Sequence, residues 1–292
     1  MTAASVPGRR GAPAARRLSL DYLTVIGATP VEQVEAASAA GFDSVGLRFL
    51  APSDLGLEHE VVDDAVAIRD IGRACRRLGI RPLDVEVFFL GPDLDPSRAV
   101  RAADAAAEIG ASMLLAVIAT DDRHAALDRF AWLCEVAARN GMDVALEFMA
   151  WSPVRTIDEA LAFVTEADQP NAGVCVDTLH LSRSGGRPEQ VSALPGRGSF
   201  VQLCDAPAAL PAADLMRAEA RTDRLHPGEG ELWLDRLLAS IPADMAISVE
   251  VPHRRHAERS VMERASIAGQ ALRAFLAREP ELVPSARESA ST

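Results

Sequence analysis

Four oxygen-bearing side chains occur at or near the ends of four short apolar runs in the second half of the chain. The runs are MDVALEF, AGVCVD, FVQLCD and MAISVEVP, and the side chains are Glu147, Asp177, Gln202 and Glu250. Burying a carboxylate is costly unless it is paired or binds a metal, so we expect these groups just past strand ends. The carboxyl ends of parallel strands converge at one face, and oxygen-only ligation there favours Mg²⁺ or Mn²⁺ over a structural zinc ion.

A divalent ion at this place would polarise a substrate carbonyl and stabilise the enediolate that forms when an adjacent C–H is deprotonated. His180, three residues after Asp177, is expected in the loop above the ion as an acid/base or as a donor to a substrate oxygen. Arg224 precedes the turn HPGEGEL, and its guanidinium suits a carboxylate, phosphate or vicinal diol. The alternative for each carboxylate is an ordinary ion pair. For His180 it is a core position, and for Arg224 a solvated surface charge.

Three further residues are candidates for substrate binding. Arg48 lies near the end of the expected strand 43–49, Glu86 lies inside the otherwise apolar run 82–90, and Trp151 follows the run that contains Glu147. Arg48 and Glu86 could instead form an ion pair inside the fold, and Trp151 could simply pack. His226 and His253 are weaker candidates.

Composition narrows the class of protein. The chain of 292 residues is 49% hydrophobic and only 4% aromatic, which predicts a large aliphatic core, and its formal charge of -12 opposes binding to nucleic acid. No lysine occurs, which excludes Schiff-base aldolases, pyridoxal-phosphate enzymes and P-loop nucleotide hydrolases. The four cysteines show no CxxC spacing and are expected as buried thiols in the cytoplasm. No apolar run is long enough for a signal peptide or a membrane helix.

Strand-like and helix-like segments alternate along the chain. Strands are expected at about 18–25, 43–49, 82–90, 112–119, 142–148, 172–177, 200–205 and 245–252. A helix is expected after each strand, and after the seventh strand an irregular segment at 206–230 comes before the helix. Eight such units predict a single (β/α)₈ TIM barrel, because right-handed crossovers keep successive parallel strands adjacent. The barrel should span 18–278, with disordered tails at 1–17 and 279–292.

The ordered motifs LEF, CVDTLH, VQLCD, RLHPGEGEL and VEV resemble the xylose-isomerase-like TIM barrel superfamily over roughly residues 18 to 277. That group contains sugar-phosphate isomerases and epimerases, ketose 3-epimerases, inosose dehydratases, 3-dehydroshikimate dehydratases and type IV AP endonucleases. The resemblance implies metal ligands at Glu147, Asp177, Gln202 and Glu250, with the two glutamates also exchanging the substrate proton. It also implies that His180 and Arg224 hold substrate oxygens, and that the ion is Mn²⁺, Mg²⁺ or Co²⁺.

The third ligand position separates two reactions within this resemblance. Ketose 3-epimerases carry histidine where this chain has Gln202, whereas a glutamine is similar to bacterial 3-dehydroshikimate dehydratases. The breadth of the group favours a metal-dependent sugar isomerase or epimerase. The alternatives are a lyase that dehydrates 3-dehydroshikimate or an inosose, and a non-catalytic sugar-binding barrel. The expected partner is a small carbohydrate or cyclic hydroxy-ketone, with neither nucleic acid nor membrane, and the sequence leaves a homo-oligomer open.

Overall fold

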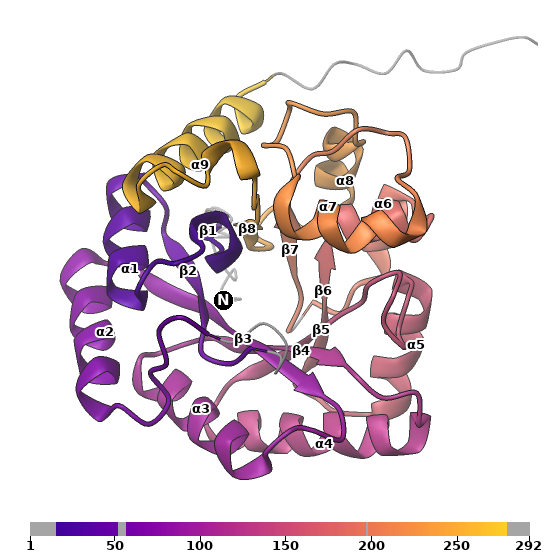
Figure 1. Ribbon diagram of the computed structural model, residues 1–292. Coiled ribbons are helices and arrows are strands. Elements are labelled where there is room, and N and C mark those ends of the chain that lie inside the picture. The colour runs from indigo at the N-terminus through magenta and orange to yellow at the C-terminus, as the bar shows by residue number, and fades with distance from the viewer. Residues whose placement is uncertain (1–15, 52–56, 197, 279–292) are drawn as a thin grey trace, which may run out of the picture.

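The computed structural model describes residues 16–51, 57–196 and 198–278. Within them the strands form one closed parallel barrel in sequence order (Figure 1). The strands are β1 Leu18–Leu20, β2 Ser44–Arg48, β3 Arg81–Leu90, β4 Met113–Ile118, β5 Asp143–Glu147, β6 Ala172–Asp177, β7 Phe200–Leu203 and β8 Ile247–Val249. The predicted (β/α)₈ barrel is therefore confirmed.

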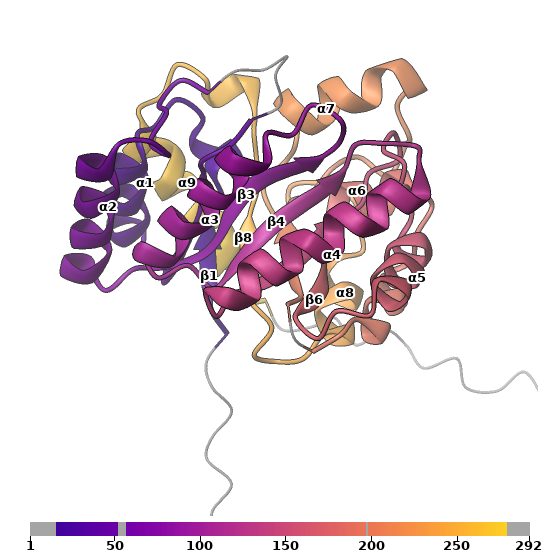
Figure 2. The same ribbon diagram turned by 90° about the horizontal axis from the view of Figure 1, so that it is seen from below.

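Helices surround the barrel and connect its strands (Figures 1 and 2). They are α1 Pro30–Ala39, α2 Ala65–Leu78, α3 Pro96–Glu108, α4 Arg123–Arg139, α5 Ile157–Ala167, α6 Thr178–Arg183, α7 Met216–Thr222, α8 Leu234–Ser240 and α9 Val261–Leu276. Short 3₁₀ helices are η1 Tyr22–Val25, η2 Pro188–Ala193, η3 Ala213–Leu215 and η4 Arg254–His256. None of the helices in the described residues is long and apolar enough to cross a membrane.

Local sequence signals account for several helix boundaries. The amide of Glu32 donates to Thr29 Oγ1 at 3.2 Å while the Glu32 carboxylate accepts from the Thr29 amide at 2.9 Å, which forms a capping box before α1. Gly141 has φ +71°, a left-handed conformation that glycine adopts without strain, and it ends the turn after α4 as expected.

Three details differ from the sequence expectations. The first strand ends at Leu20, because Asp21 caps η1 by accepting the Leu23 amide at 3.0 Å. His180 lies in α6 and not in a loop, because Asp177 caps this helix directly after β6. The segment 206–230, expected to be irregular, contains η3 and α7.

The core has two apolar parts. The larger one lies between the strands and the surrounding helices and consists mainly of aliphatic side chains. The smaller one includes Leu83, Met113, Leu115 and Phe200, which come from three different strands of the barrel. The predicted tails, 1–17 and 279–292, fall outside the described residues except for Arg16 and Arg17.

Candidate functional site

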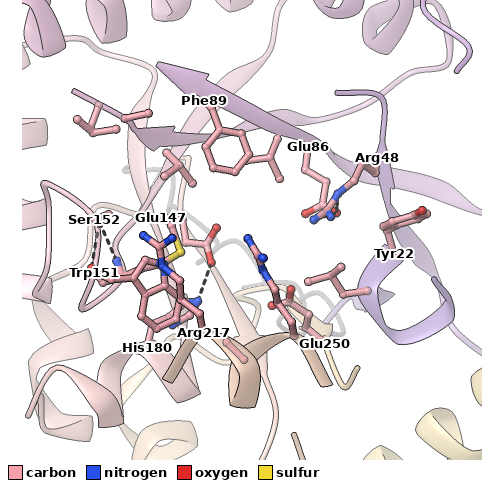
Figure 3. Close-up of a pocket in the computed structure, with 18 of the residues that line it drawn as sticks. Tyr22, Arg48, Glu86, Phe89, Glu147, Trp151, Ser152, His180, Arg217 and Glu250 are labelled. Carbon is pink, nitrogen blue, oxygen red and sulfur yellow. Dashed lines mark hydrogen bonds and ion pairs between the residues drawn. The ribbon is translucent and has the colours of Figure 1, made fainter. Parts of the chain in front are cut away.

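A cavity of about 500 Å³ opens where the strands end (Figure 3). Its walls come from the ends of β2, β3, β4, β5 and β8, together with η1, α6 and α7. Two of the predicted site residues, Asp177 and Gln202, are buried beside this cavity without lining it. The predicted residues that do line it are Arg48, Glu86, Glu147, Trp151, His180, Arg224 and Glu250.

Glu147, Asp177 and His180 form a compact group of buried ligand atoms. One atom from each side chain lies within 4.8 Å of the other two. His180 Nε2 lies 3.4 Å from a Glu147 carboxylate oxygen, and its ring meets the Trp151 indole edge to face with ring centres 5.0 Å apart (Figure 3). The Asp177 carboxylate accepts the His180 amide at 2.9 Å, so the cap that starts α6 also fixes His180 beside Glu147.

Arg224 connects Asp177 to Glu250. Its guanidinium donates to the Asp177 carboxylate and, at 3.0 Å, to Glu250 Oε2, while its side chain is 2% exposed. Burial opposes ionisation of Asp177, but the adjacent Arg224 holds the pKa of that carboxyl below its usual range. Burial raises the pKa of Glu250 well above its usual value, despite the same arginine. The guanidinium therefore bonds to two of the four predicted ligands.

Gln202 lies on β7, between β6 and β8, and its side chain has two buried hydrogen-bond partners. Its amide nitrogen donates to Asp21 Oδ2 at 3.0 Å, and its oxygen accepts from the Cys175 thiol at 3.0 Å. Asp21 follows β1 and was not predicted as a site residue, although LSLD has the same apolar run ending in a carboxylate. Burial raises the pKa of Asp21.

The donor set fits a hard divalent cation. Glu147, Asp177 and Glu250 supply carboxylate oxygens. The Arg224 guanidinium lies between Asp177 and Glu250, which shows that the local charge suits a cation. The fourth predicted ligand atom is the amide oxygen of Gln202, Oε1, which in the structure accepts a hydrogen bond from the Cys175 thiol.

Arg48 and Glu86 pair at the opposite wall of the cavity. Arg48 Nη2 lies 3.0 Å from Glu86 Oε1, and its guanidinium carbon lies 5.0 Å from the centre of the Tyr22 ring. Burial raises the pKa of Glu86 to about 8, although Arg48 acts in the other direction. The ion pair expected as the alternative is therefore present, and it lines the cavity. A role of these two residues in substrate binding stays a prediction.

Another carboxyl group, missed by the sequence analysis, lies deeper in the barrel. Asp84 is fully buried, and neither of its carboxyl oxygens has a hydrogen-bond partner among the described residues. A side chain at Gly46 would put its first carbon 2.8 Å from Asp84 Oδ1, so glycine leaves the room that this carboxyl occupies. Burial raises the pKa of Asp84 well above its usual value, which favours the neutral acid.

Helix α7 covers the mouth and was also missed. Glu219 accepts two hydrogen bonds from the buried Arg183 guanidinium, at 2.8 and 2.6 Å, which ties α7 to α6. Arg217 and Arg221 on this helix line the cavity, and Arg217 lies 6.0 Å from the centre of the Trp151 ring. Neither arginine forms an ion pair with any residue that the structure describes.

Asp205, just after β7, organises the turn that follows Arg224. Its carboxylate accepts the backbone amides of Gly228 and Leu232, both at 3.0 Å. Gly230 packs so closely that an added Cβ would lie 2.4 Å from Asp205 Oδ1. A bridge between Asp205 and Leu225 then places Arg224 at the site. Asp205 therefore anchors the motif HPGEGEL next to the predicted ligands.

Comparison with known proteins identifies the family. Residues 34–278 match the family model described as a xylose isomerase-like TIM barrel, and the chain belongs to this family.

Among curated proteins, a 3-dehydroshikimate dehydratase from Pseudomonas aeruginosa is 32% identical over 241 residues, which cover 77% of this chain and 36% of the relative. The chain therefore spans about a third of that relative's length.

Two solved structures illustrate the fold. A xylose isomerase-like TIM barrel/4-hydroxyphenylpyruvate dioxygenase fusion protein superposes with a TM-score of 0.74 at 27% identity, covering 89% of this chain and 42% of that one. A structure of the IOLI protein with a bound zinc atom has a TM-score of 0.75 at 20% identity, covering 89% and 98% of the two chains. At that identity the second likeness concerns the fold alone.

Proposed function

We propose that this chain is a divalent-metal-dependent lyase that dehydrates a cyclic hydroxy-ketone of the 3-dehydroshikimate type. The observation that carries the proposal is the 32% identity to a named 3-dehydroshikimate dehydratase across 77% of this chain. Gln202 agrees with it, because glutamine at the third ligand position is the variant that the sequence resemblance associates with these dehydratases. We therefore favour the lyase, which the sequence analysis gave as an alternative, over the isomerase.

Glu147, Asp177, Gln202 and Glu250 would hold the ion, drawn from Mn²⁺, Mg²⁺ or Co²⁺. When bound, the ion supplies Lewis-acid polarisation of the substrate ketone. Arg224 has to give up part of its contact with Asp177 and Glu250 for these carboxylates to serve as ligands. Its guanidinium would then be free to bind a substrate oxygen.

The remaining chemistry belongs to side chains of the cavity. A carboxylate, Glu147 or Glu250, takes the proton from the carbon next to the ketone, and the C–H electron pair becomes the enolate. The enolate then expels the hydroxyl group on the next carbon, which leaves as water after it receives a proton. His180 Nε2 lies 3.4 Å from Glu147 and can pass a proton between this carboxylate and the leaving oxygen.

The cavity also fits a ring that carries a carboxylate. Phe89, Met149 and Trp151 contribute apolar walls, and Arg217 and Arg221 face the same space. A guanidinium without an ion-pair partner suits a carboxylate, which it can bind through two parallel hydrogen bonds. A neutral sugar would leave these two cations uncompensated.

Isomerisation or epimerisation of a ketose is the second candidate. It is favoured by the presence of two glutamates, Glu147 and Glu250, in the wall of one cavity. One could remove the proton and the other return it to the same enediolate. The two reactions share proton removal and differ in the fate of the anion, which is either protonated again or expels a hydroxyl group.

The test is an ultraviolet assay of purified, Mn²⁺-loaded protein with 3-dehydroshikimate. We expect a catechol absorbance that appears with metal and disappears after chelation, because water loss from the ring yields an aromatic product. A metal-loaded protein that leaves 3-dehydroshikimate unchanged but interconverts ketoses would contradict the lyase assignment and support the isomerase.

A further inference from the structure

A second cavity of about 230 Å³ lies beside the active-site cavity, between η1, the end of α7 and the segment that joins β8 to α9. It shares Leu23, Ile26 and Arg221 with the larger cavity, so the two are neighbours. None of the residues described as lining the smaller cavity is acidic, in a chain whose formal charge is -12. The polar groups that face it are mostly guanidinium and imidazole groups, from Arg221, Arg254, Arg264, His226, His253 and His256.

His226 is the best evidence that this cavity is built for a ligand. The side chain is 2% exposed, yet neither of its ring nitrogens has a hydrogen-bond partner among the described residues. A buried polar group without a hydrogen-bond partner is unfavourable because it has lost its bonds to water, so such groups are rare in folded chains. Burial lowers the pKa of His226 to about 4, which makes the ring neutral near pH 7, with one N–H donor and one acceptor nitrogen.

Two neighbouring side chains, Arg264 and His256, also carry polar atoms without a hydrogen-bond partner among the described residues. Arg264 donates to the Ile26 carbonyl at 2.8 Å through Nη2, while its buried Nε is without a partner among the described residues. His256 Nδ1 is buried and equally unpartnered there, and its ring centre lies 5.5 Å from those of His226 and His253. Arg254, by contrast, has an acidic partner in Asp223. The cavity thus collects several unused hydrogen-bonding groups around one buried imidazole.

We propose that this cavity binds a tetrahedral oxyanion of the phosphate class, held by Arg264, Arg221 and His226. A phosphate accepts hydrogen bonds from guanidinium forks, and its protonated oxygen can donate to the acceptor nitrogen of a neutral imidazole.

A metal cation fits the cavity less well, although three histidines line it. Three guanidinium groups would repel the cation. In addition, the group of described metal-binding side chains whose ligand atoms come together is Glu147, Asp177 and His180, and not the three histidines.

The same chemistry has two sources, a free phosphate ion or the phosphoryl end of a substrate that reaches across Arg221 from the active-site cavity. Titration calorimetry with inorganic phosphate, and separately with fructose 6-phosphate and fructose, distinguishes them. A phosphate ester that binds at least tenfold more tightly than both phosphate and fructose identifies a substrate end, and it would favour the isomerase candidate over the lyase. An ester no tighter than inorganic phosphate identifies a site for the free ion.

Variants of the intact chain test the site itself. Arg264→Gln should weaken phosphate binding at least tenfold, and His226→Asn should do the same if its melting curve shows a folded protein. The matched control is Arg236→Gln, which removes the same charge from an exposed pair with Glu189 and should change phosphate affinity less than twofold. Three results would overturn the proposal: no saturable phosphate binding by the wild-type protein, unchanged affinity in Arg264→Gln, or Zn²⁺ binding that depends on His226 without phosphate binding. Because the assay measures affinity and not turnover, it can fail while the lyase assignment stands.

Discussion

Replacing Glu147 with glutamine is expected to lower turnover by about 10²- to 10⁴-fold, the range typical of removing an acid/base group, while the fold remains intact. The amide is nearly the same size as the carboxylate but cannot accept the substrate proton. It also removes one negative charge from the group formed with Asp177 and His180, and so weakens metal binding. Turnover of 3-dehydroshikimate at saturating Mn²⁺ measures the effect.

Glu135→Gln is the matched control, because Glu135 lies exposed on α4, outside the cavity. This variant should keep wild-type turnover. Thermal melting of both variants shows whether either substitution disturbs the barrel. A folded Glu147→Gln protein with more than a tenth of the wild-type rate would rule out this carboxylate as a proton acceptor and as a required ligand.

Replacing Arg224 with methionine is expected to lower the free energy of unfolding by about 3–5 kcal/mol in the presence of a chelator. The substitution keeps much of the buried volume but removes the cation that bonds to both Asp177 and Glu250. Asp177, whose pKa Arg224 holds below its usual range, would then be a buried carboxylate without its partner, and an uncompensated buried charge is strongly unfavourable. Denaturant unfolding at pH 7 gives the value directly.

The comparison variant is Arg236→Met, which breaks an exposed ion pair with Glu189. Pairs of this kind contribute little because water already solvates both groups, so the variant should unfold like the wild type. If Arg224→Met were as stable as the wild type, the guanidinium would not be the partner that keeps Asp177 and Glu250 buried in the chain without metal.

The strand ends of the barrel could be predicted because the sequence marks them locally. An apolar run that stops at Glu147, Asp177 or Glu250 carries both the strand and its last polar group within a few residues. Closure of the barrel in sequence order then places these groups at one mouth. The convergence of these side chains at the mouth was therefore expected from local pattern and topology alone, and their role as metal ligands stays a prediction.

Other parts of the site depend on contacts that no local pattern reveals. Gln202 bonds to Asp21, which lies 181 residues earlier and meets it only when the barrel closes. Helix α7 is short, and its position depends on the buried ion pair between Arg183 and Glu219. A helix this short has little stability of its own, so its sequence shows no clear helical period.

The proposed metal centre is tested most directly by anomalous diffraction from crystals of the Mn²⁺-loaded protein. We predict one strong peak at ligand distance from carboxylate oxygens of Glu147, Asp177 and Glu250, with the Arg224 guanidinium displaced from between Asp177 and Glu250. Absence of a peak at the barrel mouth in crystals soaked with saturating Mn²⁺, with Arg224 still bonded to both carboxylates, would contradict a metal-dependent reaction at this site.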